Sequence, residues 1–253
     1  MGLVIPFVAV LGMAVGSFVS AAVYRLARGI TVVRGRSRCP HCQHVLGAAD
    51  LVPLVSYVWS RGRCRYCGVR ISPMYPLLEV TCASGFVLLW LASATPAMWV
   101  VRATLFSLLV ALVLTDLQAG TLPDALTVTG LMLATGFAAA GWSVGLNQAL
   151  VGAAVGAATI LVIVWASRGG MGIGDAKMLA MIGAFLGPWG ALGTLVWGSF
   201  LGSVVGAGLL LTGRATRKTK LPFGPFLAAG ALLAQWTVPL WLRFVGLGAP
   251  PGS

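Results

Sequence analysis

Long apolar stretches alternate along the chain with short polar connections. Eight of these stretches approach the length of about 20 residues that a helix needs to cross a bilayer. They cover residues 3–24, 76–94, 97–115, 124–141, 148–166, 175–187, 190–212 and 223–245. The pattern therefore predicts an all-α polytopic integral membrane protein with about eight transmembrane helices.

One sizeable polar segment interrupts the pattern between the first and second stretches. We expect four parts along the chain: a first transmembrane helix (1–24), a polar segment (25–75), a transmembrane bundle (76–245) and a disordered tail rich in Pro and Gly (246–253). Because the polar segment is too hydrophilic for lipid, it must lie outside the hydrocarbon on one side of the membrane.

Composition agrees with this class. Of the 253 residues, 58% are hydrophobic and 9% are charged, and the mean hydropathy is +0.95, which excludes an ordinary soluble globular protein. No basic region or small-residue cleavage site precedes the first charge at Arg25. The first stretch is therefore expected to be a retained helix rather than a removed signal peptide.

The net charge of +12 calls for an acidic partner. Basic residues gather at the ends of apolar stretches, as a topology signal requires, so we expect membrane lipid and no nucleic acid as that partner. If residues 25–75 are cytoplasmic, alternation of eight spans places every Lys and Arg inside except Arg102 and Arg243. Both termini then face outward.

Two CxxC pairs lie in the polar segment, Cys39 with Cys42 and Cys64 with Cys67, and 21 residues separate them. Two such pairs complete a tetrahedral thiolate site, which is typical of structural zinc. A pair of disulfides is the alternative, and a reducing cytoplasm disfavours it. Four thiolates fill the coordination sphere, so this zinc would stabilise the small segment and would not activate water.

Three other residues bear on the metal site. His41 and His44 stand beside the first pair and are alternative ligands, although solvated loop positions are the simpler interpretation. Cys82 lies within an apolar stretch and is expected to be a small buried hydrophobe.

Two of the five acidic residues stand at the ends of apolar stretches where a carboxylate is costly. Asp116 ends the third stretch, and Asp175 follows a glycine-rich turn, Gly172-Ile173-Gly174-Asp175, at the start of the sixth. Alternation of the spans brings both to the cytoplasmic face. Two carboxylates there predict hydrolysis by an aspartate pair that shares a proton. The alternative is that Asp175 only caps its helix.

The positions of the two aspartates on their helices indicate which one is ionised and which one holds the proton. Asp175 begins a helix, where the dipole favours negative charge, and Asp116 ends one, where it does not. We therefore expect Asp175 to be ionised and to act as base toward water, while Asp116 more often holds the proton. Lys177, two positions along the helix from Asp175, should point elsewhere, and Asp124 after Pro123 is expected to be a helix cap.

Glycines at four-residue spacing predict close helix packing. They are Gly12 with Gly16, Gly152 with Gly156, and Gly198 with Gly202 and Gly206.

Six segments follow one another in a characteristic order. They are Gly16-Ser17-Phe18 with Tyr24-Arg25-Leu26, the cysteine pairs with Arg61-Gly62-Arg63-Cys64, Ile71-Ser72-Pro73-Met74-Tyr75-Pro76-Leu77-Leu78-Glu79, Asp116 with Leu122-Pro123-Asp124, Gly172–Asp175 with Lys177, and Leu221-Pro222-Phe223-Gly224-Pro225-Phe226. Together they resemble the type IV prepilin leader peptidases, membrane aspartic proteases of the GxGD type. Ser20 departs from the family, which typically has asparagine there.

The resemblance implies a catalytic pair, Asp116 and Asp175, with supporting roles for Gly172, Gly174, Asp124 and Lys177. The substrates would be prepilins or pseudopilins of type IV pili and type II secretion. Their short basic leader would be cleaved after a glycine at the cytoplasmic face of the bacterial inner membrane.

The resemblance also implies a second activity, methylation of the new amino terminus with S-adenosylmethionine. No glycine-rich nucleotide loop of the Rossmann type is visible in the sequence. Glu79 is a candidate contributor to this activity, and an acid at the membrane boundary is the equal alternative.

Two other functions remain open on the sequence. A different GxGD protease would cut within the bilayer and would need deeper aspartates. A transporter or metal sensor would use the carboxylates to carry ions and the cysteines to report zinc. Nothing in the sequence predicts the oligomeric state.

Overall fold

The computed structural model describes residues 2–26, 28–30, 36–167, 171–214, 216, 219 and 221–246. Over these residues the regular structure is helical, with two isolated β-bridges and no strands, so the predicted all-α class is confirmed. The described residues do not include Gly169, Gly170, Arg34, Arg168, Arg217, Lys218, Lys220 or residues 247–253 of the predicted disordered tail.

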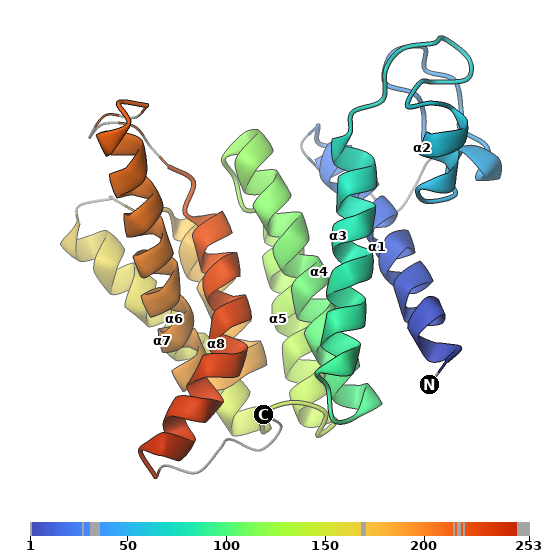
Figure 1. Cartoon of the computed structure of the whole chain (residues 1–253). Helices are drawn as coiled ribbons and strands as arrows, with labels where there is room; N and C mark the ends of the chain where they lie inside the picture. The colour runs from blue at the N-terminus through green and yellow to red at the C-terminus, as the bar shows by residue number, and fades with distance from the viewer. Residues whose placement is uncertain are drawn as a thin grey trace. The chain divides into compact units, whose positions relative to one another are not determined.

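The chain forms two compact units, residues 1–99 and 100–253. Figure 1 follows the order of their helices. The boundary between these units, at residue 99, is not one of the boundaries that we predict at residues 24, 75 and 245. Those boundaries follow the polarity of the sequence and stay a prediction.

Unit 1 contains α1 (Val4–Leu26), the short helices η1 (Ala48–Asp50) and α2 (Val55–Trp59), and α3 (Met74–Leu91). Helices α1 and α3 pack antiparallel along the glycines of α1. A Cβ on Gly12 would lie 2.6 Å from the carbonyl oxygen of Cys82, and a Cβ on Gly16 would lie 2.8 Å from that of Leu78. The predicted close packing at these glycines is confirmed, because any side chain there would separate the helices.

Unit 2 holds most of α4 (Pro96–Ala119) and all of α5 (Asp124–Ala139), α6 (Leu146–Ala166), α7 (Ile173–Leu211) and α8 (Gly224–Phe244). Among the described residues, six helices are long and apolar enough to cross a membrane: α1, α3, α4, α6, α7 and α8. With 16 residues, α5 is shorter. The 39 residues of α7 take up two of the eight predicted stretches.

A break at Gly187 divides α7 into two helical runs. Gly187 has φ 76° and ψ 178°, a conformation that only glycine adopts easily, and Pro188 follows it. The first run packs antiparallel on α6, where Gly152 faces Gly183 and Gly156 faces Leu179. The second packs on α8, where Gly198 faces Phe226.

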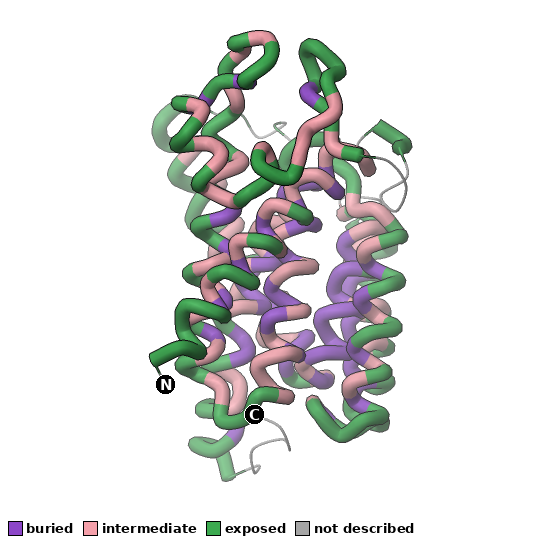
Figure 2. Tube along the Cα trace, turned by 90° about the vertical axis from the view of Figure 1, so that its right-hand side faces the viewer, coloured by how far each residue is buried: buried purple, intermediate pink, exposed green. Residues whose placement is uncertain are grey.

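The core of unit 2 lies between α4, α7 and α8. Its largest buried side chains include Leu109 and Leu112 of α4, Met178 and Ile182 of α7, and Leu227 of α8. Figure 2 shows these helices with long buried stretches and with exposed residues along their outer faces. Close packing of this kind fixes where the ends of each helix lie.

Candidate active site

Asp116 lies three residues before the end of α4 and is buried, with 8% of its surface exposed. Its Oδ2 accepts a hydrogen bond of 3.0 Å from the backbone N–H of Gly224, the first residue of α8. A Cβ at position 224 would lie 2.6 Å from that oxygen. Glycine is therefore required there if the start of α8 is to hold the Asp116 carboxylate.

Asp175 is the third residue of α7 and is buried to the same extent, 8% exposed. Its Oδ2 accepts a hydrogen bond of 3.2 Å from the backbone N–H of Gly172, which caps the helix. Asp175 thus stabilises the start of its own helix, as the capping alternative predicts. Capping does not exclude catalysis, because this hydrogen bond occupies only one of the two oxygens.

The two carboxylates lie at the same end of unit 2. The loop after Asp116 turns back through a hydrogen bond of 2.9 Å from the N–H of Gly120 to the Asp116 carbonyl. It then brings Leu122 beside Gly174 at the start of α7. The charges of Asp116 and Asp175 are near enough to interact. Buried carboxylates that interact in this way favour a state with a single negative charge on the pair.

One expectation about the pair changes with the structure. Asp116 ends its own helix, but its carboxylate lies at the start of α8, where backbone N–H groups and the helix dipole favour negative charge. Asp175 lies in the same kind of environment at the start of α7. The helix dipoles therefore give no reason to expect Asp175 to be ionised and Asp116 to be protonated.

Asp124 and Lys177 form an ion pair of 2.6 Å between Oδ1 and Nζ. The prediction that Asp124 caps its helix is wrong: Pro123 is the cap residue of α5, and no side chain caps this helix. The prediction that Lys177 points away from Asp175 is confirmed. Both partners are well exposed to solvent, so the pair links the starts of α5 and α7 only weakly.

The four cysteines of the polar segment lie on two similar turns. The backbone carbonyl of Cys39 accepts a hydrogen bond from the N–H of Gln43, and that of Cys64 accepts one from the N–H of Gly68. β-Bridges flank the turns between Arg38 and Val45 and between Arg63 and Arg70. Every position of one turn is thus matched 25 residues later in the other, and the two turns present their thiols in the same way.

The four sulfurs fit a tetrahedral metal. They all lie within 4.8 Å of one another, and Cys39 and Cys67 are 3.9 Å apart. A zinc ion with four thiolates at 2.3 Å separates its sulfurs by about 3.8 Å. No disulfide joins these cysteines. Zinc bound there would be structural, since no coordination position would remain for water.

Two of the thiols have pKa values displaced in opposite directions. Backbone N–H groups of Cys42 and His41 lower the pKa of the Cys39 thiol to about 7. Although the N–H of Val69 favours its thiolate, burial and the other three sulfurs raise the pKa of Cys67 to about 12. Four sulfurs this close ionise together only around a positive ion.

The histidines stay outside the cluster. His41 and His44 are exposed, and the His44 ring stacks on Tyr66 with centroids 3.5 Å apart. The grouped ligand atoms come from the four cysteines alone among the described residues. Cys82 is fully buried in α3, as predicted.

Two family profiles match the chain. One describes a bacterial peptidase A24 N-terminal domain over residues 10–93, and the other describes the type IV leader peptidase family over residues 103–207. An Aeromonas hydrophila protein named prepilin leader peptidase/N-methyltransferase is 39% identical over 213 residues, which cover 81% of this chain and 71% of the relative. The chain belongs to the type IV leader peptidase family.

Other members of this family carry the same name. The Myxococcus xanthus protein is 37% identical over 94% of this chain and 75% of its own length. The Pseudomonas putida protein is 36% identical over 94% and 90%. No solved structure matches the chain. Membership makes this multi-pass membrane protein a protease.

Glu79 of this leader peptidase is buried in α3, with 7% of its surface exposed. Its Oε2 accepts a hydrogen bond of 2.8 Å from the backbone N–H of Leu54, the residue that caps α2. Leu54 has φ 58°, in the left-handed region that non-glycine residues rarely adopt. Glu79 therefore fixes the start of α2 against α3.

Sequence reasoning missed two of these contacts. Gly224 stands in a segment noted only for its resemblance, and the signal for its role was a glycine at a helix start after Pro222 and Phe223. The sequence indicates no role for Asp50, yet its carboxylate accepts a hydrogen bond of 3.2 Å from the Tyr66 hydroxyl and forms an ion pair of 3.5 Å with Arg65. Nothing in the sequence spacing of Asp50, Arg65 and Tyr66 indicates that they lie together.

Proposed function

We propose that this chain is an aspartic endopeptidase that removes the short basic leader from type IV prepilins or pseudopilins at the cytoplasmic face of the inner membrane. The observation that carries the proposal is the convergence of Asp116 and Asp175 at one end of unit 2, each held by the N–H of a glycine at a helix start. Membership in the leader peptidase family supports the substrate class.

In the proposed mechanism the pair holds one proton and one water. The ionised aspartate takes a proton from the water, whose oxygen attacks the scissile carbonyl carbon. The protonated aspartate gives its proton to the carbonyl oxygen. Collapse of this gem-diol intermediate breaks the C–N bond, and the leaving amine takes a proton from the pair. The pair regains one proton from a hydroxyl of the intermediate, which becomes the carboxyl group of the cleaved leader.

The two hydrogen bonds from glycine would orient this chemistry. Each engages an Oδ2, so that the Oδ1 atoms can face a common water. Exchange of roles between the aspartates needs no rearrangement, because both lie at helix starts. The sequence-based assignment of Asp175 as the base stays a prediction. Distinct pH–rate profiles of the Asp116→Glu and Asp175→Glu enzymes would support it, and identical profiles would remove it.

Substrate orientation would come from the bilayer rather than from long-range attraction. The enzyme and the leader are both basic, so electrostatic steering offers no gain. The apolar helix that follows the leader would be held beside the aspartates by the membrane. This arrangement places cleavage at the membrane surface, and so favours a leader peptidase over a protease that cuts deep within a span.

The proposal is tested by co-expression with a pilin-like substrate and a gel shift on cleavage. We expect Asp116→Asn and Asp175→Asn to leave the leader uncleaved, while the control Asp124→Asn cleaves normally because its carboxylate only pairs with Lys177. Cleavage that persists in either active-site variant would exclude the aspartyl mechanism. A transporter or metal sensor would give no gel shift with the unaltered chain.

The names of the relatives support a second activity, N-methylation of the product. S-Adenosylmethionine would supply the methyl group. Among the described residues of unit 1, Glu79 is the buried carboxylate, and one of its oxygens already holds the N–H of Leu54. Mass spectrometry of the processed substrate, with and without S-adenosylmethionine, tests the activity: a product that never gains 14 Da, the mass of one methylene, would refute it.

A further inference from the structure

An exposed apolar surface on unit 1 has no part in the proposed chemistry. Its large side chains, which we call the α2 patch, belong to Leu51, Val52, Val55, Val58 and Trp59. Val58 and Trp59 are 73% and 77% exposed. Val55, Val58 and Trp59 follow i, i+3, i+4 spacing and share one face of α2. A contiguous apolar surface of this kind marks an interaction site.

A hydrogen bond fixes the level of this patch relative to α3. The N–H of Leu54, just before α2, donates to Glu79, the sixth residue of α3. At 1.5 Å per residue, Glu79 lies only about 8 Å along the helix from its start. With 18 residues in all, α3 needs nearly all its length to cross the hydrocarbon. The start of α2 therefore lies at the membrane boundary, beside the first turns of α3 (Figure 1).

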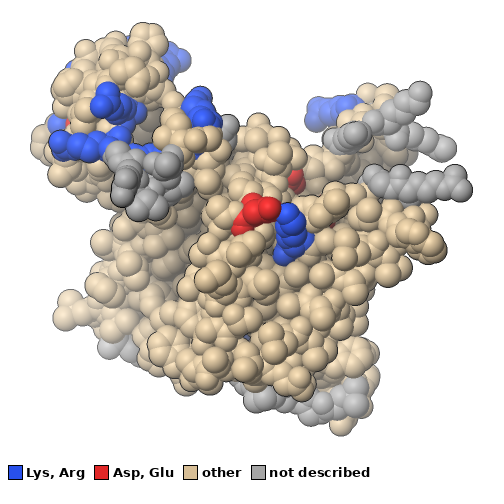
Figure 3. All heavy atoms as spheres, turned by 180° about the vertical axis from the view of Figure 1, so that it is seen from behind, with Lys and Arg blue, Asp and Glu red and all other residues tan. Residues whose placement is uncertain are grey.

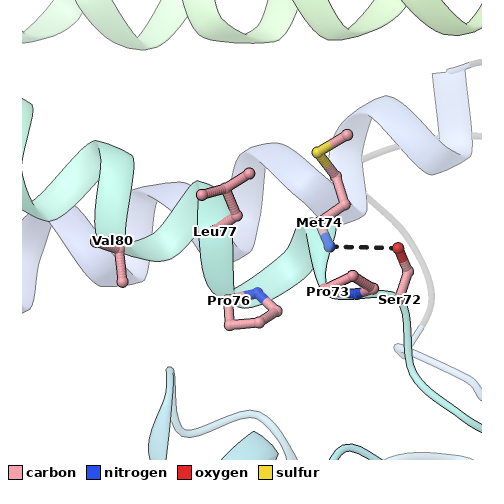
Figure 4. Close-up of a pocket in the computed structure, with 6 residues that line it drawn as sticks. All are labelled: Ser72, Pro73, Met74, Pro76, Leu77 and Val80. Carbon is pink, nitrogen blue, oxygen red and sulfur yellow. Dashed lines mark hydrogen bonds between the residues drawn. The ribbon is translucent and has the colours of Figure 1, made fainter.

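The first turns of α3 are apolar on their outer side as well. A hollow of about 510 Å³ is lined there by Ser72, Pro73, Met74, Pro76, Leu77 and Val80. Figure 4 shows that these side chains come from one short stretch and that only Ser72 among them ends in a hydroxyl, which accepts from the N–H of Met74. At this level the hollow suits lipid chains better than water.

The polar segment that carries the patch is rich in positive charge. The described residues of the polar segment include seven exposed arginines: Arg28, Arg36, Arg38, Arg61, Arg63, Arg65 and Arg70. Figure 3 shows Lys and Arg side chains gathered over this segment. Asp50 is the one acid among residues 36–72, and it is paired with Arg65. The segment is therefore complementary to an anionic surface.

We propose that the α2 patch inserts into the headgroup boundary of an anionic bilayer, with the arginines of the polar segment on lipid phosphates. An apolar face beside basic residues, at the depth of a membrane boundary, is the composition of an interfacial helix, and Trp at such a boundary is a common anchor. Glu79 holds the start of the inserted helix, so the cysteine segment stays fixed close to the membrane. The rival occupant of the patch is the apolar helix of the substrate.

The test uses the full chain labelled with 5-fluorotryptophan in nanodiscs, with the Trp59 signal assigned by its loss in Trp59→Phe. A lipid with a Gd³⁺ chelate on its headgroup broadens fluorine signals near the membrane surface. Trp197, whose Nε1–H donates to Thr237 inside unit 2, is the internal control. In nanodiscs with phosphatidylglycerol and no substrate, we expect the Trp59 signal to fall at least about twofold more than that of Trp197, as for an interfacial side chain.

Two comparisons complete the test. Replacing phosphatidylglycerol by phosphatidylcholine, or Arg61 and Arg63 by Gln, should weaken the broadening of Trp59; equal broadening in all samples would overturn the role of the arginines. A Trp59 signal that is unaffected by the labelled lipid would overturn insertion. A Trp59 signal that the labelled lipid leaves unaffected, but that shifts when a pilin-like substrate is added, would assign the patch to the substrate helix instead.

Discussion

The cysteine site and the aspartate site of this leader peptidase are assembled in opposite ways. The cysteines lie on two copies of one local turn, 25 residues apart, and each copy is closed by its own backbone hydrogen bonds. The aspartate site has no local repeat: Asp116 accepts a hydrogen bond from Gly224, which lies 108 positions later in the chain. Residues close together in the sequence form each cysteine turn, whereas the packing of α4, α7 and α8 forms the aspartate site.

This difference predicts what each site tolerates. The cysteine turns need a metal to complete them, because a small polar segment buries little apolar surface. The aspartate end needs the helix starts of α7 and α8 to be placed accurately, since each carboxylate is oriented by one backbone N–H. Loss of metal should therefore disturb unit 1, whereas shifts of a few tenths of an ångström should disturb catalysis.

The largest effect should come from the aspartates themselves. We expect Asp116→Asn or Asp175→Asn to reduce single-turnover cleavage by about 10³-fold or more, and the double variant to be no worse than either, because the two act as one unit on one water. Rates on a purified pilin-like substrate decide this. Losses that multiply in the double variant would indicate two independent functions.

A smaller effect should separate the two glycine donors. In Gly224→Ala the new Cβ would lie 2.6 Å from Asp116 Oδ2, and in Gly172→Ala it would lie 3.3 Å from Asp175 Oδ2. We expect a loss of about 10²-fold for the first, because the carboxylate must move, and a loss several times smaller for the second. Gly136→Ala, with nothing within 4 Å, is the matched control. Equal losses at 224 and 172 would show that crowding of Asp116 is not what matters.

The metal site should matter less to cleavage than to the fold of unit 1. In Cys64→Ser we expect bound zinc to fall from about one per chain to nearly none. Proteolysis of residues 36–72 should become faster, and cleavage of substrate should fall by about tenfold at most. Elemental analysis and limited proteolysis measure these changes, with Cys82→Ala as the control that keeps its zinc. Loss of activity as deep as in Asp116→Asn would contradict the separation of the two sites.

The smallest effect is expected at Lys177. Its ion pair with Asp124 is exposed, so Lys177→Met should change the cleavage rate by less than about twofold. The same assay in high salt should give little further change. A loss of tenfold or more would move this lysine into the catalytic site.

Much of the fold follows from the sequence because each of its features is local. Apolar length predicts the helices, and glycine spacing predicts the packing of α1 on α3. The CxxC spacing predicts the sulfur cluster for the same reason.

Long-range contacts were beyond the sequence. The hydrogen bond from Gly224 to Asp116 depends on where two packed helices end, and the one from Leu54 to Glu79 depends on the path of a loop. The first contact removes the helix-end argument for a difference between the two aspartates, because that argument considered each carboxylate only with its own helix. The assignment of Asp175 as the base stays a prediction. The role of Asp124 as a cap failed since Lys177, 53 positions later, forms the ion pair with it.

The central claim is that Asp116 and Asp175 bind one water between them while glycine N–H groups hold their outer oxygens. A cryo-EM structure of the protein in nanodiscs with an uncleavable prepilin tests it most directly. We expect one oxygen of each carboxylate within about 3 Å of a single water beside the scissile carbonyl, with Gly224 still bound to Asp116. Carboxylates too far apart to share a water in that complex would contradict the account.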